Sequence, residues 1–119
     1  VEVSFIEQDV LKLNSLSINA DVIISNPPYV KHAEQQQMAK NVLAYEPHQA
    51  LFVDNDDPLV FYRKICKLAK NNGGPTRVYF ELNEFHKDDY RAMAEHLDCL
   101  SYEFRQDFRG RPRMLKLEF

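Results

Sequence analysis

The stretch that decides the fold is Asp-Val-Ile-Ile-Ser-Asn-Pro-Pro-Tyr-Val, residues 21–30. Its β-branched run Val22–Ile24 has no polar alternation, which is typical of a central strand of a parallel sheet with both faces buried. The two prolines that follow have no N–H for a strand ladder, and a residue before proline is pushed out of the helical region, so the strand is predicted to end at Asn26. Asn26 and Tyr29 then lie at the carboxyl end of the strand, where open α/β sheets bind their ligands.

The turn after this strand carries the groups needed to hold a planar NH2 group. The Asn26 side-chain oxygen and the Pro27 carbonyl are acceptors for its two hydrogens, and the Tyr29 ring can pack on the flat group that carries it. Holding both hydrogens favours the pyramidal geometry in which the nitrogen lone pair points at an electrophile, so orientation and placed dipoles would supply the catalysis. The same tetrapeptide also fits a simple strand-ending turn, but the hydrophobic strand before it favours the functional interpretation.

Length and composition narrow the class of protein. The 119 residues are 45% hydrophobic and 28% charged, which predicts one soluble globular domain with its own core. No apolar run approaches the roughly 20 residues of a membrane span, and the start Val1-Glu2-Val3 does not resemble a signal peptide, so we expect no membrane contact and a cytoplasmic location. The net charge of −3 gives no overall basic field of the kind that binds nucleic acid, so we do not expect direct nucleic-acid binding. Cys66 and Cys99 are predicted to be reduced core thiols, with a disulfide as the alternative.

The rest of the chain is predicted to alternate strands with helices. Before residue 21, a strand-like pattern runs from Val3 to Asp9. After residue 56 we expect a helix at Leu59–Ala69, which Asp56-Asp57-Pro58 opens and Asn71–Pro75 ends. A buried strand at Arg77–Leu82 follows, and then an amphipathic helix at Phe85–Leu97 with Phe85 on its apolar face. A hairpin is expected at Leu100–Phe119. This alternation of strands and helices is typical of an α/β fold.

Two motifs resemble a known family. Ser25-Asn26-Pro27-Pro28-Tyr29-Val30 is similar to the catalytic motif of S-adenosylmethionine-dependent amino-methyltransferases, which include enzymes that act on DNA or RNA bases. Tyr45-Glu46-Pro47-His48-Gln49-Ala50-Leu51 resembles specifically the HemK/PrmC branch, which methylates the glutamine amide of the Gly-Gly-Gln motif in peptide-chain release factors. The resemblance covers essentially the whole chain. It implies an α/β fold, the C-terminal half of a Rossmann-like class I methyltransferase sheet ending in an antiparallel hairpin.

The resemblance also implies roles for individual residues. It assigns catalysis to Asn26, Pro27 and Tyr29, and substrate binding to these residues together with Pro28 and Glu46. Glu46 would brace the catalytic loop. S-adenosylmethionine binding would fall to Asp9 and Val10 near the adenine, and to Asn26; no metal is expected. In the final hairpin, the family's acid, glycine and arginine would correspond to Asp107, Gly110 and Arg113.

Family features missing from the chain shape the remaining expectations. Its three glycines, Gly73, Gly74 and Gly110, form no Gly-x-Gly loop for a cofactor, so this loop and the N-terminal substrate-docking domain are expected upstream of Val1. Residues 1–119 would then be the C-terminal part of one methyltransferase domain, inactive alone and weak or absent in S-adenosylmethionine binding. The chain also departs from the family at Asn83-Glu84-Phe85-His86, where Gly and Gln are usual.

Three functions stay open from the sequence. The leading hypothesis is a release-factor glutamine methyltransferase; the alternatives are an adenine amino-methyltransferase acting on DNA or RNA and a noncatalytic binding module.

A sheet without its upstream strands would leave one apolar edge of Val22–Ile24 unpaired. We therefore expect Val3–Gln8 to pair beside this strand or to exchange between two copies, and the chain to self-associate.

Overall fold

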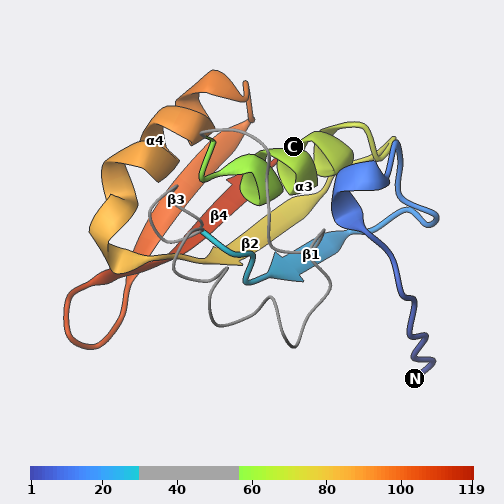
Figure 1. Ribbon diagram of the computed structural model, residues 1–119, viewed down its shortest axis with the longest axis horizontal. Helices are drawn as coiled ribbons and strands as arrows, with labels where there is room; N and C mark the ends of the chain where they lie inside the picture. Colours follow the sequence, from blue (N-terminus) through green and yellow to red (C-terminus); the bar gives the residue numbers. More distant parts are fainter. Residues whose placement is uncertain (30–56) are drawn as a thin grey trace, which may run out of the picture.

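The computed structural model describes residues 1–29 and 57–119, which fold as one mixed sheet covered by helices. The strands are β1 (Val22–Ser25), β2 (Arg77–Glu81), β3 (Ser101–Gln106) and β4 (Pro112–Glu118), and their spatial order is β1-β2-β4-β3. β1 and β2 are parallel, whereas β4 is antiparallel to both β2 and β3 (Figure 1). This arrangement confirms the predicted α/β fold with a partial methyltransferase-like sheet that ends in an antiparallel hairpin.

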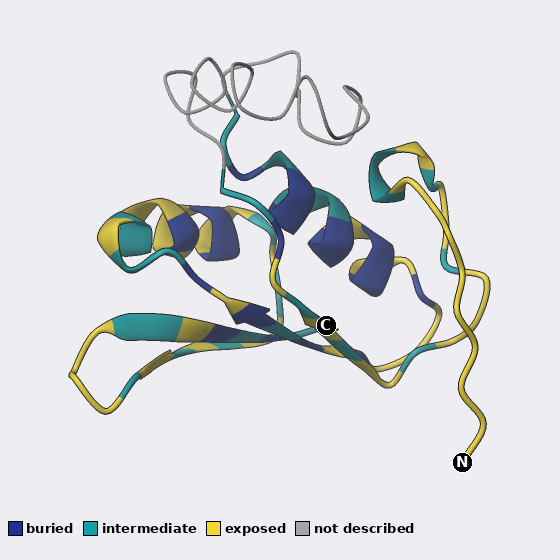
Figure 2. Cartoon of the chain, turned by 60° about the horizontal axis from the view of Figure 1, so that its bottom comes forward, coloured by how far each residue is buried: buried dark blue, intermediate teal, exposed yellow. Residues whose placement is uncertain are grey.

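Two α helices pack on one face of the sheet, α3 (Val60–Lys70) and α4 (Lys87–His96) (Figure 2). The core lies between them and the strands, and its least exposed members are Tyr62, Cys66, Ala69, Val78, Phe80, Tyr90, Met93, Ala94, Leu115 and Leu117. Burial of this apolar surface stabilises the layer arrangement. Cys66 and Cys99 are free thiols, as predicted, and burial raises the pKa of Cys66 to about 12. None of the helices among the described residues has the length and apolar character of a membrane span.

Helix α3 begins and ends within one residue of the predicted bounds, Leu59–Ala69. Asp57 Oδ1 accepts a hydrogen bond of 3.0 Å from the Leu59 N–H, and its other oxygen pairs with Arg63 Nε at 2.9 Å. An acid at this position satisfies an unpaired N–H and interacts favourably with the helix dipole. At the other end, Gly73 adopts a positive φ of 84°, a conformation that glycine takes without strain.

The second helix is shorter than predicted. A 3-10 turn, η2 (Glu84–His86), precedes α4, and the Asn83 side chain caps this turn by accepting a bond of 3.1 Å from the Phe85 N–H. Tyr90 and Met93 are buried, but Phe85 is 81% exposed, so its predicted place on the apolar face is wrong. The tighter turn before Lys87 puts residue 85 out of phase with the α-helical face.

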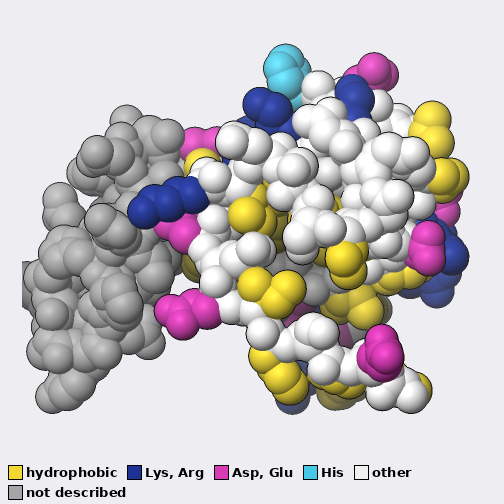
Figure 3. Space-filling model, turned by 90° about the vertical axis from the view of Figure 1, so that its right-hand side faces the viewer, with side chains coloured by type: hydrophobic (Ala, Val, Ile, Leu, Met, Phe, Trp, Pro, Cys, Tyr) yellow, Lys and Arg dark blue, Asp and Glu magenta, His cyan; other side chains and the backbone are white. Residues whose placement is uncertain are grey.

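β1 differs most from the prediction. It pairs with β2 alone among the described strands, and Ile24 is 81% exposed and Val22 43% exposed. The expectation of a central strand buried on both faces is therefore wrong for this structure. The described helices cover only one face of the sheet, and hydrophobic side chains remain visible on the side of the molecule seen in Figure 3. A hydrophobic run is buried only where other elements cover it.

The segment before β1 also departs from the prediction. Residues 1–8 form no strand and are exposed, so the expected strand ending at Asp9 and the expected pairing of Val3–Gln8 beside β1 are both wrong. Instead, Asp9 Oδ1 accepts a bond of 3.0 Å from the Leu11 N–H and caps the 3-10 helix η1 (Val10–Lys12), whose Val10 packs against the core. An extended segment has no ladder without a neighbouring strand, and none lies beside residues 1–8 in the described part.

The structure confirms the predicted C-terminal hairpin, which the antiparallel strands β3 and β4 form. Asp107 Oδ1 accepts hydrogen bonds from the N–H groups of Arg109 (2.8 Å) and Arg111 (3.0 Å), and Gly110 has a φ of 78°. These backbone hydrogen bonds, the one from Arg111 first, hold the pKa of Asp107 below its usual value. The predicted acid and glycine of the hairpin therefore shape the turn between β3 and β4.

Candidate functional site

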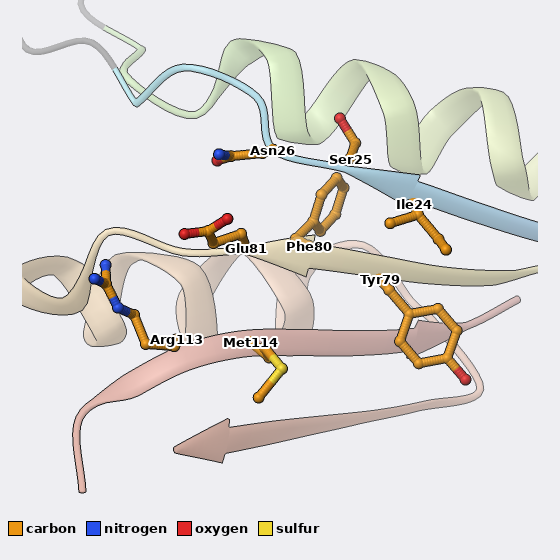
Figure 4. Close-up of a pocket in the computed structure, with 8 residues that line it drawn as sticks. All are labelled: Ile24, Ser25, Asn26, Tyr79, Phe80, Glu81, Arg113 and Met114. Atoms are coloured by element: carbon orange, nitrogen blue, oxygen red, sulfur yellow. The ribbon is translucent and has the colours of Figure 1, made fainter. Parts of the chain in front are cut away.

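The Asn-Pro-Pro-Tyr motif lies at the carboxyl end of β1, as the sequence predicts. Ser25 is the last paired residue of β1, opposite Phe80 of β2, so Asn26 and Glu81 come next on neighbouring strands. The side chains of Asn26, Glu81 and Arg113 gather at this end of the sheet (Figure 4). Two adjoining pockets share these three residues. The motif is therefore placed at the kind of edge where α/β sheets bind ligands.

One of the two pockets contains the whole motif. Asn26, Pro27, Pro28 and Tyr29 line it together with residues of the turn that follows β2. Asn26 is exposed, while Pro27 is buried and the two residues after it are half-buried. An exposed amide beside a buried backbone can meet a polar ligand without moving the frame that carries it. The structure thus brings the four residues together in one pocket.

The buried Tyr62 of α3 reaches the motif, which the sequence reasoning missed. Its hydroxyl lies 3.0 Å from the Pro27 carbonyl oxygen and 3.1 Å from the Glu81 carbonyl oxygen. The Tyr90 hydroxyl of α4 lies 3.3 Å from the Tyr62 hydroxyl and accepts a bond of 3.1 Å from the Asn83 N–H. Burial is the largest cause that raises the pKa of both tyrosines, so both stay protonated at neutral pH. Four elements therefore meet in one hydrogen-bond network.

The Tyr29 ring is held by residues of the turn that follows β2 and of α4. It stacks on the His86 ring with a centroid separation of 4.1 Å and an interplanar angle of 8°. Its hydroxyl donates a hydrogen bond of 2.7 Å to Asp89 Oδ2, and His86 Nδ1 lies 3.7 Å from the same oxygen. One face of the Tyr29 ring is therefore against a histidine. Any flat group that the ring receives must lie on a different part of its surface.

Two arginines of the hairpin near the site each lie beside a carboxylate. Arg111 Nη1 lies 3.0 Å from both carboxylate oxygens of Glu84, and Arg113 Nε lies 3.6 Å from Asp107 Oδ2. Arg113 also donates a hydrogen bond of 3.5 Å to the Leu82 carbonyl. A carboxylate beside each of these two arginines offsets its charge, so the hairpin presents them as neutralised pairs.

The other predicted site residues lie apart from the motif or outside the described residues. Asp9 is exposed and caps η1, and Val10 lines a separate pocket together with Ile23 and Ser25. That pocket adjoins the one at Asn26, because both contain Ser25. Glu46, and with it the motif Tyr45–Leu51, falls outside the described residues.

A sequence signal could have found part of what was missed. Tyr62 and Tyr90 lie on apolar helix faces, a pattern that by itself predicts core residues. A buried tyrosine, however, nearly always needs a partner for its hydroxyl, which makes it a candidate for contact with a nearby polar backbone. No such rule identifies His86, because its contact with Tyr29 depends on how the turn after β2 is placed.

The relatives of the chain are consistent with its two motifs. No protein-family model matches it. It is 41% identical over 123 residues to a release factor glutamine methyltransferase of Flavobacterium psychrophilum, with 100% of this chain and 42% of the relative covered. For enzymes of the same name from Bacteroides thetaiotaomicron and Lactococcus lactis, the identities are 38% and 33%, each over 96% of this chain and 42% of the relative.

The match thus spans 42% of the length of each of these relatives and lies in their C-terminal part. It includes the whole sheet and the site at the carboxyl end of β1. Identity above 30% over nearly all of the chain is shared with several curated proteins that carry one name. Over nearly its whole length, the chain is therefore homologous to the C-terminal part of proteins named release factor glutamine methyltransferase.

Proposed function

We propose that this chain is the catalytic part of an enzyme that transfers a methyl group from S-adenosylmethionine to the glutamine side-chain amide of the Gly-Gly-Gln motif in peptide-chain release factors. The observation that carries the proposal is the position of Asn26 and Pro27, directly after the last paired residue of β1 and in one pocket with Tyr29. The names of the relatives support the choice of a glutamine amide as the substrate.

The roles of the motif residues follow from their acceptors. The Asn26 side-chain oxygen would accept one hydrogen of the amide NH2, and the Pro27 carbonyl would accept the other. With both hydrogens held, the nitrogen lone pair is turned toward the electrophile, and the loss of amide conjugation is compensated by two placed dipoles. S-adenosylmethionine, when bound, would supply the electrophilic methyl group and leave as S-adenosylhomocysteine, and the amide nitrogen would lose one of its two hydrogens to water as a proton. Tyr29 and Pro28 would form the wall on which the amide rests.

The residues available for the cofactor fit one end of it. Asp9 presents an exposed carboxylate beside Val10, which is half-buried against the core, and this pair fits an adenine amino group and its ring edge. We propose that the Gly-rich loop and the substrate-docking domain belong to a part of the protein outside this chain. On its own the chain should then bind S-adenosylmethionine weakly or not at all. A calorimetric titration that gives micromolar affinity for the 119 residues would contradict this expectation.

The decisive experiment uses the full-length enzyme, meaning this chain joined to the upstream part that its relatives have. Methyl transfer is measured to a release factor and, separately, to DNA and RNA oligomers. We expect transfer to the release factor at its Gly-Gly-Gln glutamine. In that assay Asn26→Ala should cost on the order of 3 kcal/mol of transition-state stabilisation, mostly in turnover, because a preorganised acceptor is lost.

A matched variant controls for the loss of an asparagine. Asn71 is exposed at the far end of α3, and Asn71→Ala should leave methylation unchanged. Near-normal methylation by Asn26→Ala would show that the motif is only a turn. Methylation of the oligomers in place of the release factor would show that the substrate is an adenine, although the pairing of Arg111 with Glu84 and of Arg113 with Asp107 speaks against that outcome.

We also propose that the isolated chain self-associates through β1. The pairing of Val3–Gln8 with this strand does not occur, so one edge of β1 has no partner strand in the described part of the chain. The exposed Ile24 adds apolar surface beside that edge. Unpaired N–H and C=O groups on such an edge recruit a strand from another molecule.

A further inference from the structure

The end of β1 creates a backbone acceptor that strand pairing does not satisfy. The ladder between β1 and β2 stops at Ser25 and Phe80. Pro27 and Pro28 have no N–H and cannot continue it. The Pro27 residue is nevertheless buried, and a buried carbonyl needs a donor. The donor comes from a helix far along the chain.

That donor is the Tyr62 hydroxyl. It lies 3.0 Å from the Pro27 oxygen and 3.1 Å from the Glu81 oxygen, so its single hydrogen is shared between two carbonyls or held by one of them. Pro27 follows the end of β1, and Glu81 is the last residue of β2. The hydroxyl therefore joins the two strands just beyond the point where their ladder ends.

The donors and acceptors of the network give it a single direction. The Tyr90 oxygen accepts from the Asn83 N–H, so the Tyr90 hydrogen points to the Tyr62 oxygen, and the Tyr62 hydrogen points to the carbonyls. Both tyrosine side chains are at most 1% exposed. The Tyr62 ring meets Phe80 and Tyr90 edge-on at centroid distances of 4.9 and 5.0 Å, which holds its hydroxyl in place.

We propose that Tyr62 is a positioning residue for methyl transfer, whose hydroxyl fixes the direction of the Pro27 carbonyl before the substrate arrives; this inference rests on the proposed function. A carbonyl oxygen has two lone pairs. Tyr62 occupies one and leaves the other for a hydrogen of the glutamine amide. A carbonyl tied to the end of β2 cannot turn away from the site, so less ordering remains for the moment of reaction.

The test is Tyr62→Phe in the full-length enzyme, which removes the hydroxyl and keeps the packed ring. We expect kcat for release-factor methylation to fall about 10- to 100-fold, because a slightly misdirected acceptor costs rate, while KM stays within about threefold. Tyr102→Phe is the matched control. Tyr102 lies on β3, outside both pockets at Asn26, and its hydroxyl donates a hydrogen bond of 3.0 Å to Glu95. Loss of this hydroxyl should leave kcat unchanged.

Tyr90→Phe separates positioning from stability. It also removes a buried hydroxyl but keeps the direct contact between Tyr62 and Pro27, so its kcat should fall only about 3- to 10-fold at unchanged KM. All variants are assayed well below their thermal midpoints. Equal kcat losses in the two variants, in proportion to their loss of thermal stability, would overturn the proposal. If Tyr62→Phe does not fold, an unchanged kcat in Tyr90→Phe overturns it instead.

The outcomes also separate this inference from the proposed function. A wild-type enzyme that does not methylate the release factor refutes both. A wild-type enzyme that is active, an Asn26→Ala variant that is inactive and a Tyr62→Phe variant with full kcat refute the positioning role alone.

Discussion

Side-chain donors contact backbone carbonyls at both ends of β1, but the two ends differ in how many donors serve each carbonyl. At the amino end, the Asn72 amide donates to the Ala20 carbonyl at 2.8 Å and to Thr76 Oγ1 at 3.0 Å, and Thr76 Oγ1 also contacts that carbonyl at 3.1 Å. At the carboxyl end, the one hydrogen of Tyr62 faces two carbonyls. At the amino end two donors therefore serve one carbonyl, whereas at the carboxyl end one donor serves two carbonyls and acceptor capacity remains. Only the carboxyl end lies in a pocket with Asn26, so unfilled acceptors mark the end suited to a ligand.

The largest expected effect concerns the core behind the carboxyl end. Phe80→Ala should lower the free energy of unfolding by about 3–5 kcal/mol, because the ring is 1% exposed and packs against Tyr62. At the amino end, Val22→Ala should cost about 0.5 kcal/mol, since Val22 is 43% exposed. Urea unfolding of the chain measures both. Similar losses at the two positions would mean that the outer face of β1 is covered as well as the inner one.

A second effect tests whether the amino end is purely structural. Asn72→Ala leaves the buried Thr76 hydroxyl with one partner fewer and should cost about 1–3 kcal/mol of unfolding free energy. Methyl transfer by the full-length enzyme should not change. Asn71→Ala, at the exposed neighbouring position, is the control and should affect neither quantity. A fall in kcat with Asn72→Ala, at temperatures where the variant is folded, would extend the functional role to both ends of the strand.

A smaller effect distinguishes the two ends by pH. Tyrosines in the unfolded chain ionise near pH 10, whereas burial raises the pKa of Tyr62 and Tyr90 in the folded state. Their stabilising effect is therefore complete below pH 10 and is lost above it, by about 1.4 kcal/mol per pH unit for each group. The contacts at the amino end join an amide, a hydroxyl and a backbone carbonyl, which have no charge to gain in this pH range.

Urea unfolding between pH 9 and pH 11 measures this dependence. Cys66 titrates in the same direction, with its pKa raised by burial to about 12, so the series is run in a Cys66→Ala background. Tyr62→Phe should make the decline above pH 10 shallower. A decline that is identical with and without the Tyr62 hydroxyl would mean that this hydroxyl ionises equally well in both states.

The smallest effect on stability comes from the outer face of β1. Ile24→Lys should change the free energy of unfolding by no more than about 0.5 kcal/mol, because the side chain is 81% exposed. It should nevertheless reduce self-association in light scattering, since charge on an edge strand opposes pairing. Ile18→Lys adds the same charge at a residue that is 71% exposed and outside the strand. Equal effects of the two lysines would attribute the change to net charge, and a wild-type chain that is monomeric would remove the self-association proposal.

Much of the fold follows from patterns that are local in the sequence. The helix opened by Asp57 and ended at Gly73, the strand Arg77–Glu81 and the hairpin around Gly110 are all where their capping, strand and turn signals predict. The place of Asn26 just beyond a strand follows from the two prolines. These features depend on interactions between residues a few positions apart, and the residues themselves specify such interactions.

Other features depended on distant partners and could not be predicted. The segment 1–8 has the composition of a strand but no neighbour to pair with in the described part of the chain. The hydrogen bonds of Tyr62 span 35 residues to Pro27 and 19 residues to Glu81. Propensity and periodicity carry no information on which carbonyl a buried hydroxyl will meet.

By itself, therefore, the sequence determined the helix at Val60–Lys70, the strand at Arg77–Glu81 and the C-terminal hairpin, and that an amide, a backbone carbonyl and a tyrosine follow one hydrophobic strand. Only the tertiary structure decided that this strand has an exposed face and a free edge in the described part, and that Tyr62 holds the Pro27 carbonyl. The physical reason is that conformation at a turn or cap is set by short-range sterics and hydrogen bonds. Burial and pairing are set by whichever surfaces the folded chain brings against each other.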